Sequence, residues 1–416
     1  MKCVEGNKMP AAFADDGRSF AEMSAMIASR PTRDVLFEGG PSIELPRRFG
    51  LLRGSRRDVV FRAAFVIALA WLPLVILSTA QALALNTDSE LSILRDVGAH
   101  ARYLLAAPLL IVAEAECGGR LSIVLRQFIT AGLVPDGQVE RFNTAIASSR
   151  RLFDSKAAYA AIAALAYLIG VTALVSLPAE QVPAWMRPVS VIPLYSLAGW
   201  WHLLVSIPLL LIAVLGWIWR LALWTRILWL TTRLDLHLMA SHPDRAAGLG
   251  FLAISVRGFS IVSAAFAIIT AGRAGNVVLL AGALPPRQFV IYAGAQLAFA
   301  TLFVAPLLAF TPALLKTWRK GTLEYGSLSR RVGSAFEDKW FVANRGAEPA
   351  ALDKPDFSAT TDLYSITANV QAIRFVPIDN ASLLMLAGAT LLPFVPVAVL
   401  TVPLDVIWSN IKDLLI

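Results

Sequence analysis

Glu114, His202 and Arg257 carry side chains that can hold a proton or a charge within strongly apolar stretches of this chain. An ionisable group in such surroundings costs free energy, so each needs a partner or a function. Glu114 and Arg257 fall at similar depth when residues are counted from the ends of their stretches. The sequence therefore favours a buried ion pair between them. The alternative is an interfacial Glu114, with Arg257 directed into a polar cavity or toward the surface.

His202, in the string WWHLLVS, admits two interpretations. The favoured one is a packing role in which the ring is hydrogen-bonded to a neighbouring group. The alternative is a proton relay or a ligand contact, since the pKa of imidazole lies close to physiological pH.

Four polar residues crowd into the string RLDLHLMASHPD and raise the question of a metal site: Asp235, His237, His242 and Asp244. On a helix, Asp235 and His237 would point about 200° apart, and Pro243 disfavours a helical conformation at His242. The four side chains therefore need not converge on one ion. The sequence favours no metal here and predicts that Asp244 caps the helix that follows.

Common catalytic and nucleotide-binding motifs do not occur in the sequence: there is no HExxH, GxxxxGK[ST], paired CxxC or GxGxxG. Gly258-Phe259-Ser260 has the Gly-x-Ser pattern of intramembrane serine proteases. No histidine follows it in the chain, so a Ser-His pair would have to use a residue from an earlier segment. The sequence predicts a protein that is not an enzyme and needs no cofactor.

Basic residues alternate with tryptophans in GWIWRLALWTRILWLTTRLDLHLM. If a helix continues through this string, Arg226, Arg233 and His237 lie within about 40° of one another on one face. Indole rings and arginine stems favour the headgroup layer of a membrane. The sequence predicts an interfacial helix, with Arg220, Arg226, Arg233 and His237 as candidate contacts for an anionic lipid or ligand.

The elements that must position these residues are seven apolar stretches, each close to the roughly 20 residues that a helix needs to cross a bilayer. Hydrophobic residues make up 57% of the chain and the mean hydropathy is +0.63, which favours a membrane protein over a soluble one. None of the stretches alternates like a barrel strand, so the predicted fold is an all-α polytopic bundle. The predicted spans are 59–81, 99–117, 156–178, 193–215, 249–271, 288–312 and 381–404.

The distribution of Lys and Arg predicts the orientation, because short basic loops stay on the cytoplasmic side. Basic clusters precede the first span and follow the second, fourth and sixth, which places the N-terminus inside and the C-terminus outside. The net charge of +8 is explained by this topology and by attraction to anionic lipids of the cytoplasmic leaflet, so no nucleic-acid partner is expected. Cys3 and Cys117 both fall on the predicted cytoplasmic side, where a structural disulfide is not expected.

The apolar stretches and the distribution of Lys and Arg predict four parts of the chain. We expect a disordered cytoplasmic tail at 1–45, six spans with helical connections at 46–312, a cytoplasmic helical cap at 313–380, and the last span with a short outer C-terminus at 381–416. Residues 118–155 should form a helical hairpin broken at Val134-Pro135. Within the cap we expect one helix over 315–342 and another that starts after Ser358 and ends before Pro377.

Several strings resemble a family of multi-pass bacterial inner-membrane proteins that has no established activity. They are ARYLLAAPLLIVAE, WWHLLVSIPLLLIAVLGWIWRLALWTR, DFSATTDLYSITANVQAIRFVPID and, the most specific, RLDLHLMASHPDRAAGLGFL. The resemblance covers most of the chain after about residue 50. It implies a location in the bacterial inner membrane and a helical architecture, but no catalytic or binding residue.

Three functions fit these observations. The leading hypothesis is a non-enzymatic transporter or channel-like element. The alternative is a membrane scaffold or sensor that recruits a partner through 313–380, and an intramembrane enzyme comes third. A transporter should bring Glu114, His202 and Arg257 to one polar cavity, whereas a scaffold should have a dry bundle and an exposed apolar patch on the cap.

Overall fold

The computed structural model describes residues 37, 56–84, 93–176, 183–186, 195–341 and 356–401. These residues form helices and turns, with no strand among them, so the all-α prediction is confirmed for the described part of the chain. The predicted tail at 1–45, apart from Phe37, and the predicted outer C-terminus after residue 401 lie outside the described residues.

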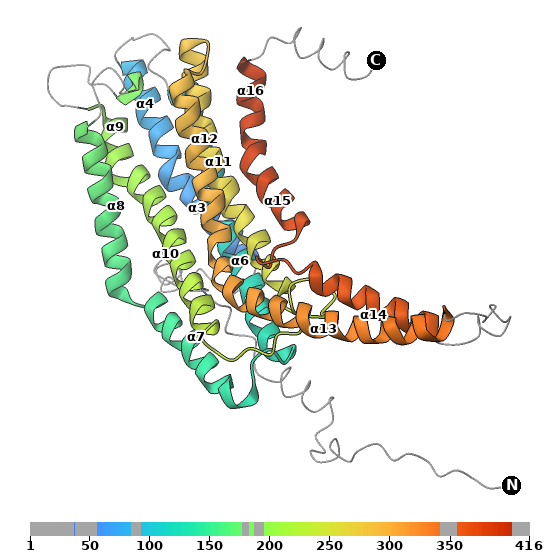
Figure 1. Ribbon diagram of the computed structural model, residues 1–416. Coiled ribbons are helices and arrows are strands. Elements are labelled where there is room, and N and C mark those ends of the chain that lie inside the picture. The colour runs from blue at the N-terminus through green and yellow to red at the C-terminus, as the bar shows by residue number, and fades with distance from the viewer. Residues whose placement is uncertain are drawn as a thin grey trace, which may run out of the picture. The chain divides into compact units, whose positions relative to one another are not determined.

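Six helical segments of the described chain are long and apolar enough to cross a membrane, which supports the prediction of a membrane protein. They are Asp58–Leu83, Lys156–Ala173, Leu197–Thr231, Gly250–Ala281, Pro286–Trp340 and Asn380–Thr401. Their main α-helices, seen side by side in Figure 1, are α3 (Arg56–Ala70), α4 (Leu72–Ala84), α8 (Lys156–Ser176), α10 (Ile207–Thr231), α11 (Ala253–Ala281), α12 (Pro286–Val304), α15 (Asn380–Leu391) and α16 (Val395–Thr401).

The predicted second span lies in another helical stretch, formed by α5 (Val97–His100), the π-helical segment η3 (Ala101–Ala106) and α6 (Ala107–Thr130). This stretch is not among the six, and α6 carries Glu114, Glu116 and Arg120 close together. It nevertheless packs along α11 inside the bundle. A count of seven spans, and the orientation with the N-terminus inside, stay predictions.

Helix α11 lies at the centre of the bundle and is the most buried of the apolar helices. Small residues let it approach its neighbours closely, as is common between membrane helices. The tightest crossing is with η3, where a Cβ atom added to Gly272 would lie 2.4 Å from the Cβ of Ala101 and 3.3 Å from the Cα of Gly98. No side chain larger than that of glycine fits at position 272 without moving a helix.

Two prolines account for two π-helical segments. Pro108 follows η3, and Pro208 follows η7 (His202–Ser206), which joins α9 (Leu197–Trp201) to α10. Proline has no N–H, and its ring clashes with the carbonyl four residues earlier, so a wider preceding turn relieves the contact. The last bonds of both segments have this wider spacing, from the Ala107 N–H to the Arg102 oxygen and from the Ile207 N–H to the His202 oxygen.

Proline has no N–H to donate to the carbonyl oxygen four residues before it. Side chains of neighbouring helices donate hydrogen bonds to two such oxygens. The Leu204 oxygen, four residues before Pro208, accepts a hydrogen bond from the Tyr167 hydroxyl at 3.1 Å. The Leu69 oxygen, four residues before Pro73, accepts one from the Trp201 indole N–H at 3.1 Å. In a bilayer no water could supply these bonds, so the contacts tie α3 to α9 and α8 to η7.

The two helices predicted in 118–155 and the break at Val134-Pro135 are confirmed. Helix α6 ends at Thr130, the chain turns through Val134 and Pro135, and α7 (Val139–Phe153) then packs mainly along α10. The rings of Phe128 and Phe142 meet across this break at 5.7 Å.

The predicted continuation of the fourth span past residue 215 is confirmed as far as Thr231, but the helix does not extend to Arg233 and His237. Helix α10 ends at Thr231, whose hydroxyl bonds back to the Ile227 oxygen, and residues 232–249 form a loop. The His237 N–H donates to the Leu133 oxygen at 2.9 Å, and the Arg233 guanidinium lies 3.7 Å from the Trp229 ring centroid. Because His237 is outside the helix, it does not share a helix face with Arg226.

Helices α13 (Thr311–Trp340) and α14 (Asp356–Gln371) lie side by side and extend away from the other helices (Figure 1); we call this pair the arm. The predicted helix over 315–342 is confirmed. The second helix starts at Asp356, so Ser358 is inside it and is not its N-cap. The Ser329 and Thr367 hydroxyls are 2.8 Å apart, and the Phe336 and Phe357 rings meet at 4.9 Å.

The base of the arm is fixed to the rest of the structure. The 3-10 segment η9 (Ala305–Phe310) connects α12 to α13. The Thr311 hydroxyl donates to the Phe375 oxygen at 2.9 Å, and the Phe375 ring stands edge-on to Trp318. Gly321 faces Ala240 of the 232–249 loop so closely that an added Cβ would lie 2.5 Å from the Ala240 Cβ.

Candidate functional sites

Glu114 lies between two arginines from two other helices. Its Oε1 accepts a hydrogen bond from Arg220 Nη2 of α10 at 2.6 Å, and its Oε2 pairs with Arg62 Nη2 of α3. All three side chains are about nine-tenths buried, with 9%, 11% and 7% exposure for Arg62, Glu114 and Arg220. We call these residues the triad. It ties α3, α6 and α10 together through charges that have little access to water.

Aromatic rings surround one side of the triad. The Arg220 guanidinium lies 5.1 Å from the Trp217 ring centroid and 5.4 Å from that of Phe153, which are favourable cation–π distances. The Trp217 indole donates to the Leu110 oxygen at 3.0 Å. Arg220 is therefore inside the structure, and not at the surface position expected of a lipid contact. Arg226 donates to the Ser148 and Ser149 hydroxyls of α7 at 2.9 and 2.6 Å.

The favoured ion pair between Glu114 and Arg257 is wrong, because each residue has other partners. Arg257 of α11 pairs with Asp379 at the start of α15. Counting residues from the ends of two helices compares their depths, but it does not give the direction in which each side chain leaves its helix. Arg62 and Arg220 are the two partners of Glu114 that this counting missed.

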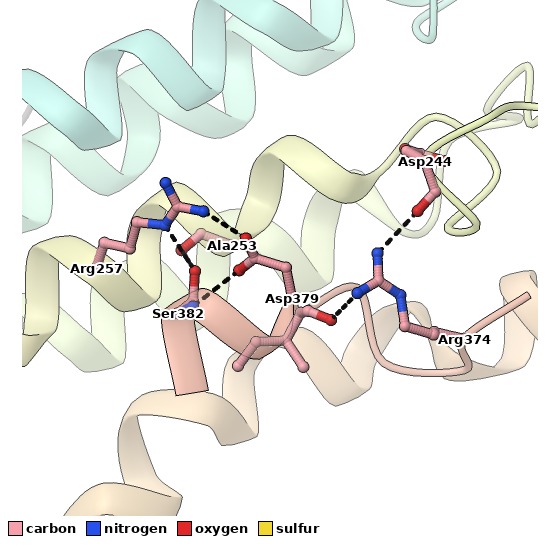
Figure 2. A network of polar contacts seen from close by, with 7 residues as sticks. Asp244, Ala253, Arg257, Arg374, Asp379 and Ser382 are labelled. Atoms are coloured by element: carbon pink, nitrogen blue, oxygen red, sulfur yellow. Dashed lines mark hydrogen bonds and ion pairs between the residues drawn. The ribbon is translucent and has the colours of Figure 1, made fainter. Parts of the chain in front are cut away.

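Arg257 belongs to a second polar cluster, shown in Figure 2. Its Nε donates to the Ser382 hydroxyl at 2.8 Å, and the Asp379 carboxylate accepts the Ser382 backbone N–H at 3.1 Å. The Ser382 hydroxyl in turn donates to the Ala253 oxygen at 3.3 Å. These bonds join the first turns of α11 and α15.

Arg374 makes the second half of this cluster. We call the whole cluster, formed by Asp244, Ala253, Arg257, Arg374, Asp379 and Ser382, the latch. Its side chain donates to the main-chain carbonyl oxygens of Asp244 at 2.8 Å and of Ile378 at 2.7 Å (Figure 2). Its backbone N–H donates to the main-chain carbonyl oxygen of Arg245 at 2.8 Å. Arg374 lies between α14 and α15, so the latch binds the segment that leaves the arm to the loop that leads into α11.

Asp244 is the organising residue of that loop. Its carboxylate accepts the backbone N–H groups of Ala246, Gly248 and Gly250 at 2.8, 3.2 and 2.7 Å. Burial raises the pKa of this carboxyl, but the three N–H groups and His242 outweigh burial and hold the pKa below its usual value of 3.8. The predicted capping of this helix by Asp244 is wrong: the N-cap of the 3-10 turn Gly250–Leu252 is Leu249 and that of α11 is Leu252, and neither position has a side-chain cap. The Asp244 carboxylate instead orders the loop and reaches only the first N–H of the turn, that of Gly250.

Of the four residues considered for a metal, His242 and Asp244 contact each other, whereas Asp235 has a different partner. His242 Nδ1 lies 2.9 Å from an Asp244 oxygen, whereas Asp235 accepts a hydrogen bond from the Gln138 side chain at 2.9 Å. Within the described part of the chain, no group of three or more His, Cys, Asp or Glu residues is arranged to hold a metal ion.

Asp244→Asn should lower the free energy of unfolding by about 1–2 kcal/mol at pH 7, because the amide has one acceptor oxygen where the carboxylate has two. The folded pKa of Asp244 is lowered, so its contribution is present above the unfolded pKa and is lost as pH falls through the folded value. The difference between wild type and variant in thermal midpoint should shrink below about pH 3.8. The exposed Asp362→Asn is the control. A difference that grows in acid would contradict the assignment.

A third polar cluster contains His202. The Tyr103 hydroxyl is 3.2 Å from His202 Nδ1, and the Trp185 ring stands edge-on to the imidazole at 5.2 Å. Tyr103 belongs to η3 and His202 to η7, so the two π-helical segments meet at this contact. The contact supplies the hydrogen-bond partner that a packing role requires.

Asp96 extends the third cluster to the start of α5. It accepts hydrogen bonds from Asn276 of α11 at 2.6 Å, from the Trp185 indole at 3.0 Å and from the Ala99 backbone at 2.8 Å. Sequence reasoning did not select Asp96 or Asn276. The sequence does offer one signal: Asn276 is an amide residue inside a stretch of small and apolar residues near the end of the fifth predicted span.

Glu114, Arg257 and His202 therefore lie in three separate clusters: the triad, the latch and the Tyr103–His202 contact. Comparison with protein-family models, with curated proteins and with solved structures found no match to this chain.

Proposed function

We propose that this chain is a non-enzymatic protein of the bacterial inner membrane that acts as a scaffold or sensor and recruits a protein partner through the arm. The observation that carries the proposal is the arm itself, which extends from the apolar helices and is bound at its exit by the latch (Figures 1 and 2). A partner that moved the arm would act directly on Arg374 and Arg257, and hence on α11 and α15.

The partner-binding surface in this proposal is the basic face of α13, formed by exposed cations and defined by Lys316, Arg319, Lys320, Arg330 and Arg331. At ~100° per residue these five positions fall within about 120° of one another, and the exposed Glu337 and Asp338 fall in the same sector, so the face is basic over residues 316–331 only. The residues of α13 that contact α14, among them Ser329 and Phe336, point roughly the opposite way. A partner with an acidic segment would complement this face.

Transport is the second candidate, and it rests on a different observation. The two π-helical segments meet at Tyr103 and His202, and π-helical turns occur frequently at functional sites. Against it, Glu114 and Arg257 have their own partners in other clusters, so the sequence argument for one polar path through all three residues no longer holds.

In-cell photo-crosslinking tests the recruiting role. A photoreactive amino acid at Lys320 or Ser327 should give one reproducible adduct, identified by mass spectrometry as a protein with an acidic segment. The same probe at the outward-facing Leu168 of α8 should not give it. The Arg330→Glu/Arg331→Glu variant should lose the adduct while its thermal midpoint stays close to wild type. Equal adducts at all positions, or an adduct that survives charge reversal, would count against the proposal.

Cysteine labelling tests the proposed orientation. In a Cys3→Ser/Cys117→Ala background, Ala283→Cys between α11 and α12 should react with an impermeant thiol reagent in intact cells. Ser334→Cys on the arm should react only after the membrane is opened. Labelling of position 334 from outside would reverse the orientation and remove the arm from the cytoplasm.

A further inference from the structure

Phe37 is the single described residue before Arg56, and its side chain is part of the hydrophobic core. It lies in the stretch that the sequence assigns to a cytoplasmic tail, yet its exposed fraction is only 4%. Burial of a phenylalanine ring removes a large apolar surface from water. The N-terminal segment is therefore joined to the rest of the structure at this ring.

The ring of Phe37 packs on Phe153, the last residue of α7. The two ring centroids are 5.3 Å apart, and the ring planes are tilted by 60°. Phe153 is 1% exposed and also stands edge-on to Tyr159 of α8, at 6.0 Å. Tilted and edge-on pairs at these separations are the arrangements that aromatic rings prefer. We call the surface formed by Phe153 and Tyr159 the corner, because it lies where α7 ends and α8 begins.

The backbone of Phe37 supports a specific contact. Its φ is 64°, in the left-handed region that a bulky side chain rarely adopts. Such a conformation is strained and persists where the surroundings of the residue fix it. Glycine would adopt the same φ with little strain, but it has no ring to bury. The contact of the Phe37 ring with the corner is thus the interaction that compensates the strain.

The corner also touches the triad. The Arg220 guanidinium lies 5.4 Å from the ring centroid of Phe153, and the same guanidinium binds Glu114 at 2.6 Å. Phe153 therefore contacts Phe37 and Arg220 alike. A shift of the Phe153 ring would change the surroundings of an arginine whose side chain is 7% exposed.

We propose that the corner is a binding site for an aromatic side chain and that the chain's own Phe37 occupies it. The N-terminal segment is thereby strapped to α7 and α8 beside the triad. Arg56, where α3 begins, follows nineteen positions after Phe37. An extended chain of this length spans up to about 65 Å, so the segment can reach the corner of its own chain. The strap is separate from the arm and does not depend on the recruiting role.

Photo-crosslinking in cells identifies the occupant of the corner. Para-azidophenylalanine at position 37 of the full chain should insert into the peptide that contains Phe153 or Tyr159, in a product of monomer mass. The same probe at Phe341, which is 75% exposed, should not label that peptide. An adduct of dimer mass would assign the site to a second copy, and an adduct with another protein would assign it to a partner. Either result, or no adduct with the corner, would overturn the strap.

Hydrogen exchange of the purified full chain measures what the ring does to the corner. Phe37→Ala should increase the exchange rate of the backbone amides in 150–160 by about tenfold, because local opening there no longer has to displace a buried ring. These amides include the Asp154 N–H, which closes the last turn of α7 on the Arg150 oxygen at 2.9 Å. Phe37→Leu keeps an apolar side chain and should give a smaller increase.

Two controls make the exchange result local. Phe341→Ala removes an exposed ring by the same substitution and should leave 150–160 unchanged. In Phe37→Ala, the amides of α14 should exchange as in the wild type. Equal exchange of 150–160 in wild type and Phe37→Ala, or an equal increase throughout the chain, would contradict a local strap. Neither measurement on the corner involves the arm, so its failure leaves the crosslinking test of the recruiting role untouched.

Discussion

Glu114→Gln should destabilise the protein by about 3–5 kcal/mol, the cost expected when one partner is removed from a buried ion pair. In the wild type, the Glu114 carboxylate balances Arg220 and Arg62 at about nine-tenths burial. Glutamine preserves the shape of the side chain but removes the negative charge from between the two guanidinium groups. The measurement is equilibrium unfolding of detergent-purified protein, followed by helical circular dichroism.

Two double variants make the result specific to the triad. Adding Arg220→Gln to Glu114→Gln should cost less than the sum of the single effects, because the second substitution removes the charge that the first left uncompensated. Adding Arg257→Gln should instead give nearly additive effects, within about 0.5 kcal/mol, because Arg257 pairs with Asp379 in the latch. Strong coupling between Glu114 and Arg257 would contradict the structure, in which these two residues have different partners.

Sequence length and hydropathy were sufficient to predict most of the helices. An apolar run of about 20 residues has few ways to satisfy its backbone in a bilayer other than a helix, so the pattern predicts the element directly. The two helices of 118–155 and the break between them at Val134-Pro135 followed from an equally local rule. Each depends on residues that are close in the sequence.

The pairing of buried charges could not be predicted in the same way. Depth follows from counting, but the partner of Glu114 depends on the rotation of α6 relative to α3, α10 and α11. That rotation is set by the packing of the whole bundle, including the approach of η3 to Gly272. Asn276 and Asp96 were missed for the same reason, because they are far apart in the sequence and meet only after the helices pack.

The end of α10 shows a different limit of prediction from local sequence. The string after Thr231 has helix-forming residues and no proline before Pro243, so local propensity favours a continued helix. The observed loop is held by distant groups, including the Leu133 oxygen and the Gln138 side chain. Tertiary hydrogen bonds outweigh local preference here, and they bring Asp244 and Arg245 within reach of Arg374.

Gly272→Ala should destabilise the protein by about 1–3 kcal/mol, and Gly272→Leu by more than about 3 kcal/mol, because both overpack the crossing of α11 and η3. An added Cβ would lie 2.4 Å from the Ala101 Cβ, a separation that requires one helix to move. Such a movement would also separate Asn276 of α11 from Asp96, whose hydrogen bond lies one helical turn away. Thermal and denaturant unfolding in detergent measure the effect.

A compensating substitution distinguishes the steric clash with Ala101 from any other destabilising effect of alanine at position 272. Ala101→Gly removes the atom that the new Cβ would meet, so the Ala101→Gly/Gly272→Ala double variant should recover most of the stability lost in Gly272→Ala. Gly294→Ala on α12, where an added Cβ meets nothing within 4 Å, is the matched control and should be neutral or slightly stabilising. Recovery in the double variant would place the contact between α11 and η3 as the structure has it. If Gly272→Ala is as neutral as Gly294→Ala, α11 and η3 do not cross this closely.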